Sequence, residues 1–166
     1  MLWACTITES YLKFLDEMDV FIDFLVAHGM WGMLLAAFLA GSVLPFSSEL
    51  VMLSLLAVGT DATELLICAT VGNTLGGAFN YGVGSLGKEE WIERIAKVPP
   101  DKLERGLRYV RKYGSWAGLL AWIPILGSII TVSMGFLRCR LLYSVFNMAV
   151  GKFARYALLI SAYKVV

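Results

Sequence analysis

The sequence is poor in charge, histidine and cysteine, and each shortage excludes a class of protein or site. Only 16% of its 166 residues are charged, whereas soluble domains average about 25%. The three cysteines (Cys5, Cys68 and Cys139) are odd in number and lack metal-site spacing, so we expect neither a disulfide framework nor a metal site. His28 is the single histidine. Because a lipid phosphatase needs a nucleophile such as histidine beside its phosphate site, we predict a protein that is not an enzyme, with no catalytic residues and no cofactor.

What the chain has instead is long apolar segments. Hydrophobic residues make up 58% of it, and its mean hydropathy is +0.72. Apolar runs of about 18 or more residues are candidates for transmembrane helices. We therefore predict an all-α integral membrane protein with one membrane domain over 30–166, and no nucleic-acid partner for its basic residues.

Residues 1–29 are predicted to form a separate amphipathic helix. Thr6 and Glu9 have the spacing of a capping box at its start, and Gly29 has the position of a C-cap. One side is apolar and the other acidic, which is typical of a helix on a membrane surface. Packing against another helix of the same protein explains the pattern equally well.

Two apolar segments are interrupted by proline and polar residues, at Pro45 and at Pro124 with Gly127. Non-helical backbone at membrane depth is tolerated only where protein or water surrounds it. Paired interruptions in the two halves of a chain indicate a transporter's binding site. We therefore predict two helical hairpins, over 30–60 and 114–137, each followed by a transmembrane helix. These helices are expected over 63–87 and 141–163.

The distribution of basic residues favours hairpins that turn back within the membrane. If both hairpins turn back, the basic helical loop at 88–113 and the connector at 138–140 share one side; crossing segments would place them on opposite sides. The positive-inside rule favours the first arrangement. The prediction is thus a multi-pass inverted repeat of two re-entrant hairpins, with loop 88–113 in the cytoplasm.

Three charged residues lie within the apolar segments. Glu49 follows the first break, and Lys152 and Arg155 lie near the middle of the last segment. A charge at membrane depth is costly, so it should face a cavity or a partner. One interpretation is an ion pair between Glu49 and either Lys152 or Arg155. The other is a cavity in which both cations bind an anionic headgroup, while Glu49 balances them or carries a coupling proton.

Polar residues without charge complete the candidate substrate-binding site. Three are amides expected at membrane depth, Asn73, Asn80 and Asn147. Hydrogen bonding between helices is their commoner role. Three are serines at the breaks, Ser47, Ser48 and Ser128. We expect these to cap the second helix of each hairpin, whose N-terminus would then favour an anion.

Five motifs, taken in order, resemble the YqaA branch of the DedA superfamily, also called SNARE-associated or VTT-domain membrane proteins. They are Leu44-Pro45-x-x-Ser48-Glu49, Gly72-Asn73-Thr74-Leu75-Gly76-Gly77, Arg111-Lys112-Tyr113-Gly114, Trp122-Ile123-Pro124-Ile125-Leu126-Gly127 and Gly151-Lys152-x-x-Arg155-Tyr156.

This resemblance implies two opposed re-entrant hairpins and lipid movement across a bacterial inner membrane, with undecaprenyl phosphate or a phospholipid as cargo. It also implies an acidic residue near the first hairpin, matched by Glu49, and an arginine near the second, matched by Arg155. Two positions depart from the pattern. Phe46 replaces the usual glycine, and Ser128 replaces an aspartate, so one candidate proton-carrying carboxylate is absent.

Three hypotheses about function remain open. The first is a flippase- or scramblase-like transporter of an anionic phospholipid or polyprenyl phosphate, with proton coupling and homo-oligomer formation left open. The second is a proton- or ion-coupled transporter of a small solute. The third is a membrane assembly factor that transports nothing.

Overall fold

The computed structural model describes residues 20–42, 47–87, 99–123 and 126–165, and its regular structure there is entirely helical. The elements are α2 (Gly29–Gly41), α3 (Ser48–Ala57), α4 (Ala62–Ser85), α6 (Pro100–Tyr113), the 3-10 helix η1 (Gly114–Trp122), α7 (Leu126–Phe136) and α8 (Leu141–Val165). The predicted all-α class is confirmed for these residues. The predictions for residues 1–19, Pro45 and Pro124 lie outside the described residues.

Local sequence signals determine where several helices begin and end. Asp61 caps α4, because its carboxylate accepts from the backbone N–H groups of Glu64 at 3.0 Å and Thr63 at 2.8 Å. These two bonds lower the pKa of Asp61. Proline stands in the first turn of α6, where it breaks no helical hydrogen bond. Gly114 ends α6 with φ +56°, a conformation that favours glycine.

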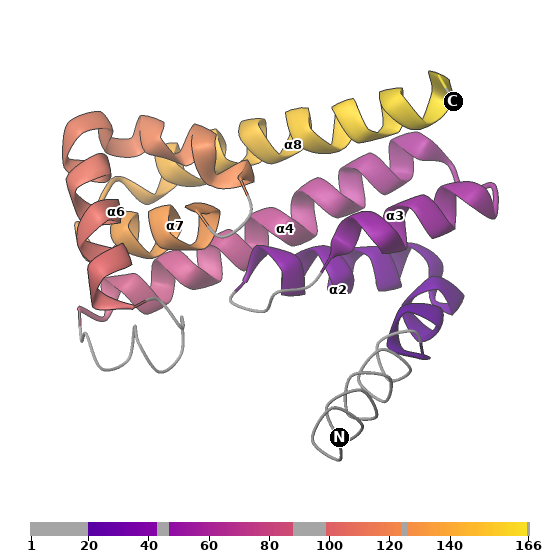
Figure 1. Ribbon diagram of the computed structural model, residues 1–166, viewed down its shortest axis with the longest axis horizontal. Coiled ribbons are helices and arrows are strands. Elements are labelled where there is room, and N and C mark those ends of the chain that lie inside the picture. The colour runs from indigo at the N-terminus through magenta and orange to yellow at the C-terminus, as the bar shows by residue number, and fades with distance from the viewer. Residues whose placement is uncertain (1–19, 43–46, 88–98, 124–125, 166) are drawn as a thin grey trace, which may run out of the picture.

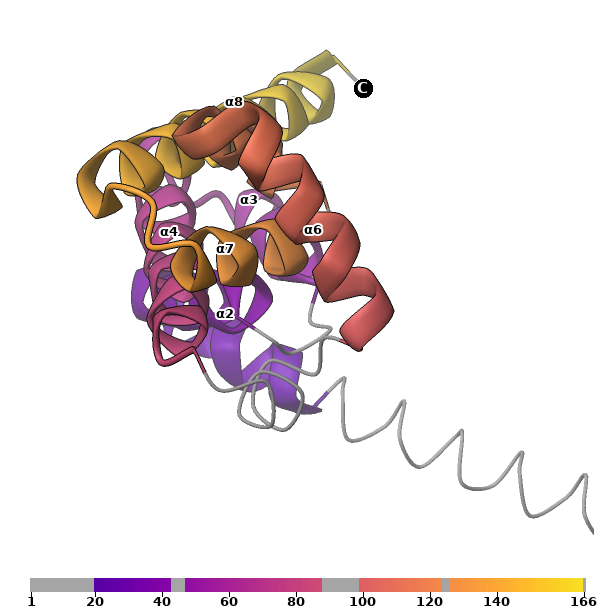
Figure 2. The same ribbon diagram turned by 90° about the vertical axis from the view of Figure 1, so that its left-hand side faces the viewer.

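The chain reverses direction twice around two long helices (Figure 1). α3 runs back along α2 beside one half of α4, and α7 runs back from the end of η1 beside the other half. α8 runs alongside α4. Seen from the end, α7 lies between α4 and α6 (Figure 2). The end of α2 and the first turn of α7 therefore approach each other, since Ser42 and Ser128 are joined by a hydrogen bond.

The long helices turn polar residues inward and apolar residues outward. Asn73 and Asn80 on α4 and Asn147 and Lys152 on α8 are buried. Large apolar side chains lie exposed at helical spacing, on α4 at Ile67, Val71, Leu75 and Phe79 and on α8 at Leu142, Phe146, Val150 and Phe153. Within the described ranges, no helix is both long enough and apolar enough to qualify as a membrane span.

Glycines allow α4 to pack very closely against α2. A Cβ atom at Gly72 would come within 2.3 Å of the Leu34 carbonyl oxygen, and one at Gly76 within 2.3 Å of the Phe38 carbonyl oxygen. The second half repeats this contact, because a Cβ atom at Gly151 of α8 would lie 2.5 Å from the Leu119 carbonyl oxygen of η1. The first helix of each reversing pair thus packs on the following long helix through glycine, as small residues permit.

This packing predicts a sharp difference between two glycines of α4. Gly76→Ala forces α2 to move and is expected to lower the free energy of unfolding by about 1–3 kcal/mol. Gly82→Ala, whose added Cβ meets nothing within 4 Å, should leave it unchanged or raise it by up to about 1 kcal/mol. Equilibrium unfolding in mixed detergent micelles measures the free energy of unfolding of both variants. Equal effects at the two positions would contradict the close approach of α2 and α4.

Candidate functional site

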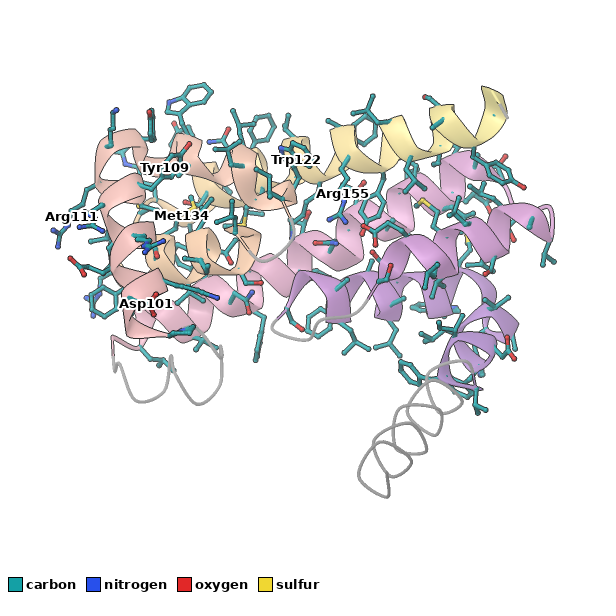
Figure 3. The ribbon with its side chains drawn as sticks, viewed as in Figure 1. Asp101, Tyr109, Arg111, Trp122, Met134 and Arg155 are labelled. Carbon is teal, nitrogen blue, oxygen red and sulfur yellow. The ribbon has the colours of Figure 1, made fainter. Side chains whose placement is uncertain are left out.

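An ion pair joins the first reversing pair of helices to the last helix. Arg155 of α8 forms a salt bridge with Glu49, in the first turn of α3. Arg155 also donates from Nη1 to the backbone carbonyl of Trp122 at 3.0 Å, at the end of η1. In Figure 3, Trp122 and Arg155 lie close together between the two halves of the molecule. Of the two partners that the sequence leaves open for Glu49, the structure therefore selects Arg155.

The pair is accessible from outside the protein. Both side chains keep 23% of their surface exposed. Ser47 donates its hydroxyl to the second carboxylate oxygen of Glu49 at 3.0 Å, which leaves the carboxylate bound on both sides. A partly exposed pair loses less solvation than a buried one, so an incoming anion can compete for the guanidinium.

Tyr156 links three helices behind this pair. Its side chain is fully buried, and its hydroxyl lies 2.8 Å from the Ser48 hydroxyl on α3. The Asn73 amide on α4 donates to the same phenolic oxygen at 2.7 Å. Because buried polar groups are costly when unpaired, this arrangement fixes the rotation of α8 relative to α3 and α4.

Lys152 occupies the interior one turn before Tyr156. Only 3% of its surface is exposed, and its ammonium donates to the backbone carbonyl of Asn73. The fit is close, since a Cβ atom at Gly77 would come within 2.9 Å of its Nζ atom. Among the described residues no carboxylate forms a salt bridge with Lys152. The cluster of Glu49, Lys152 and Arg155 therefore combines two basic side chains with one carboxylate.

Two hydrogen bonds hold the end of α2. Ser128 in the first turn of α7 donates to the Ser42 carbonyl at the end of α2, over 3.2 Å. The Asn80 amide of α4 donates to the Gly41 carbonyl, also over 3.2 Å. The first of these bonds holds a residue before the first break against a residue after the second, and so joins the two reversing pairs.

The expected capping role of the serines is wrong for the first hairpin. Ser47 stands at the N-cap position of α3, but its side chain makes no capping bond and binds Glu49 instead. Ser48 lies inside α3 and contacts Tyr156. Ser128 likewise lies within α7 and reaches across to α2. The three hydroxyls thus bind the Glu49 carboxylate, the Tyr156 hydroxyl and the Ser42 carbonyl, instead of accepting from backbone N–H groups at a helix start.

Two remaining predicted residues lie away from this cluster. The Asn147 amide donates to the Ser115 carbonyl at 2.9 Å, which ties α8 to the start of η1. Gly127 is buried, and its N–H donates to the Ile123 carbonyl at 2.8 Å. A Cβ atom at Gly127 would come within 2.3 Å of the Ala121 carbonyl oxygen. Both residues therefore position the second reversing pair.

Sequence reasoning did not select Tyr156 or the Trp122 carbonyl. Tyrosine in an apolar segment carries no distinctive signal, and a backbone carbonyl carries none at all. The spacing offered one clue, because Lys152 and Tyr156 are four residues apart and so share a helix face. As for metals, the described parts of the chain hold no group of three or more candidate ligands.

Comparison with known proteins gives matches along most of the chain. It is 32% identical over 157 residues to an uncharacterised protein of Haemophilus influenzae, covering 86% of this chain and 95% of the relative. It is 27% identical over 137 residues to the inner membrane protein YqaA of Escherichia coli, covering 82% of this chain and 92% of the relative. YqaA of Shigella flexneri matches to the same extent. No protein-family model and no solved structure matches.

Proposed function

Because the chain belongs to the family of the Haemophilus influenzae relative and is a YqaA-like membrane protein, we propose that it moves an anionic lipid across the bacterial inner membrane. We also propose that this family belongs to the DedA superfamily. The substrate is a phospholipid or a polyprenyl phosphate whose headgroup passes the Glu49–Arg155 pair while its tails stay in the bilayer.

The observation that carries this proposal is that the central cluster holds two basic side chains and one carboxylate. Lys152 and Arg155 lie one helical turn apart, yet in the described chain Glu49 forms a salt bridge with Arg155 and no carboxylate forms one with Lys152. An unpaired cation in the interior is costly. A phosphate that enters between α3 and α8 neutralises it, and Arg155 can bind two of its oxygens at once.

The outer surface supports a position in the bilayer. The exposed apolar side chains of α4 and α8 form stripes along both long helices, and large exposed apolar patches mark sites that contact membranes or partners. In this proposal α4 and α8 cross the membrane, and the two reversing pairs are re-entrant hairpins that enter from opposite faces. The inward-facing amides of the long helices then bind protein groups, as the lipid core requires: Asn73 donates to the Tyr156 hydroxyl, and Asn80 and Asn147 donate to backbone carbonyls.

The Glu49–Arg155 pair also favours a second candidate function, that of an assembly factor. A salt bridge that joins the halves can hold the fold together without any transport. The two functions differ in what they require of Lys152, because a structural role needs only its hydrogen bond to the Asn73 carbonyl, whereas headgroup binding needs its positive charge. A small-solute transporter shares the charges but needs no lateral opening for lipid tails.

Reconstitution of the purified chain tests the proposal directly. Liposomes carrying fluorescent phosphatidylglycerol, or a fluorescent polyprenyl phosphate, are treated with a membrane-impermeant quencher. We expect the protein to expose inner-leaflet lipid to the quencher, so that quenching exceeds that of protein-free liposomes. A pH gradient in half of the samples reveals proton coupling. Quenching equal to that of protein-free liposomes for both lipids contradicts lipid transport.

A further inference from the structure

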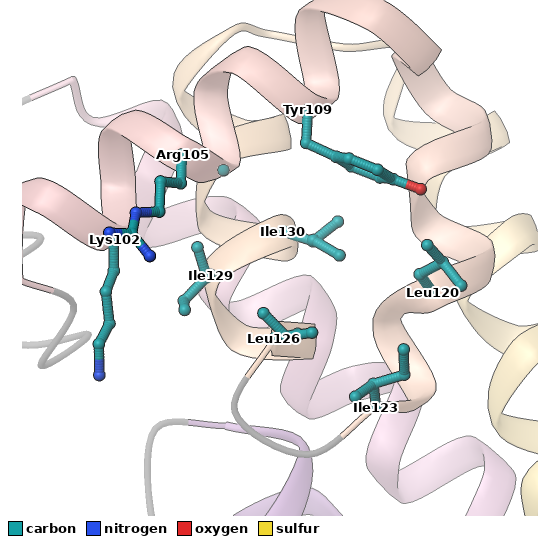
Figure 4. A pocket seen from close by; sticks show the side chains of 9 residues that line it. Lys102, Arg105, Tyr109, Leu120, Ile123, Leu126, Ile129 and Ile130 are labelled. Atoms are coloured by element: carbon teal, nitrogen blue, oxygen red, sulfur yellow. The ribbon is translucent and has the colours of Figure 1, made fainter.

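A second site, with none of the residues of the central cluster, lies between α6, η1 and α7. It is a cavity of about 350 Å³, within the size range of small-molecule pockets. Its apolar walls are Leu120 of η1, Ile123 just after η1, and Leu126, Ile129 and Ile130 of α7, with the Tyr109 ring across one side (Figure 4). Lys102 and Arg105 of α6 stand at one end of it. The cavity is thus apolar inside and positively charged at its mouth.

The two basic residues are available to a ligand. Lys102 and Arg105 are three residues apart and share one face of α6. Both are exposed, and neither forms an ion pair within the described part of the chain. Arg108 on the same helix differs, because it faces Glu104 across 3.5 Å. Free cations beside an apolar cavity match a molecule with an anionic head and a hydrocarbon tail.

We propose that this cavity holds an anionic glycerophospholipid, with an acyl chain among the isoleucines and leucines and the phosphate at Lys102 and Arg105. A membrane lipid is the occupant because the chain is a YqaA-like membrane protein and because basic residues near a bilayer surface attract anionic headgroups. The site is new relative to the Glu49–Arg155 cluster and stands whether or not the protein transports lipid.

The cavity also adjoins the central cluster. Ile123 directly follows Trp122, whose carbonyl accepts from Arg155. Leu126 begins α7, two residues before Ser128, which binds the end of α2. A lipid in the cavity therefore contacts both sides of the second break. If the protein moves lipid, this site is where a headgroup waits before it reaches Arg155.

Photo-crosslinking in nanodiscs tests this site by binding rather than transport. The probe is phosphatidylglycerol with a diazirine in one acyl chain, compared with the matching phosphatidylcholine, and labelled peptides are mapped by mass spectrometry. We expect phosphatidylglycerol to label residues 120–123 and 126–130. Labelling by phosphatidylcholine at the same peptides and to the same extent would overturn the proposal.

Paired variants separate the site from general surface charge. Lys102→Glu with Arg105→Glu is expected to reduce phosphatidylglycerol labelling there by at least about tenfold. Arg111→Glu with Lys112→Glu makes the same charge change on exposed residues of α6 outside the cavity, and should reduce it less than about twofold. Equal losses in the two variants, or none in either, would contradict headgroup binding at Lys102 and Arg105.

A third variant is designed to exclude the acyl chain from the cavity. Leu126 is 49% exposed at the cavity wall, so Leu126→Trp adds bulk without burying it in the core. It should abolish labelling of residues 120–123, whereas Leu142→Trp, at an 82% exposed position of α8, should not. Undiminished labelling in Leu126→Trp would show that the acyl chain lies elsewhere.

Discussion

Replacing Arg155 with alanine is expected to abolish lipid movement in reconstituted liposomes. The substitution removes the bidentate donor for the phosphate, the partner of Glu49 and the hydrogen bond to the Trp122 carbonyl at once. Loss of one member of a hydrogen-bonded charge pair typically costs about 2–5 kcal/mol, which corresponds to a rate or affinity loss of roughly 30-fold or more. Quenching of inner-leaflet fluorescent phosphatidylglycerol measures this loss of lipid transport.

A charge swap separates the structural part of this effect from the functional part. In Glu49→Arg with Arg155→Glu the salt bridge can form in the opposite sense. The swap therefore restores most of the free energy of unfolding that Arg155→Ala loses. It should not restore transport, because a carboxylate at position 155 repels phosphate and cannot donate to the Trp122 carbonyl.

The result that contradicts the assignment is equally clear. If the swapped protein moves lipid at the wild-type rate, the pair serves only to hold α3 against α8, and the assembly-factor interpretation gains. A matched control is Arg140→Ala, which removes an exposed arginine just before α8 that makes no salt bridge in the described residues. It should leave both stability and transport unchanged, apart from a weak contact with the Tyr143 ring.

The sequence predicted the helices well because their signals are local. Hydropathy located the long segments that correspond to α4 and α8. Gly29 was expected to end a helix; it lies at a turn with φ +54°, and α2 begins there at once. Whether the chain stops being helical at Gly29 or bends there into a second helix depends on how the residues on either side pack. Here they pack closely, since Gly32 lies against the Leu25 carbonyl.

The sequence was enough to select the charged residues of the candidate site, but not to say which of them bind each other. A charge in an apolar segment is visible in any hydropathy profile, so Glu49, Lys152 and Arg155 could be selected. Which cation meets Glu49 depends on the rotation of α8, and that rotation follows from the bonds of Tyr156 to Ser48 and Asn73. The cavity at Lys102 escaped prediction altogether, because α6, η1 and α7, although consecutive in sequence, form it only through the angles at which they pack.

Lys152→Met is expected to separate stability from transport most sharply. Methionine keeps the length of the side chain but removes a cation that is 97% buried (3% exposed) without a carboxylate partner in the described chain. Replacing buried charge by apolar atoms is often neutral or stabilising, by about 1–4 kcal/mol. The free energy of unfolding should therefore stay the same or rise.

The rate of lipid transport, unlike the stability, should fall. If Lys152 and Arg155 bind the headgroup together, Lys152→Met loses a charge contact in the interior, and lipid movement should fall by roughly 30-fold or more. Lys164→Met, at an exposed position near the end of the same helix, is the control and should move lipid normally. Stabilised protein with undiminished transport would mean that the interior cation plays no part in recognising phosphate, and Arg155 alone would then have to account for the preference for anionic lipid.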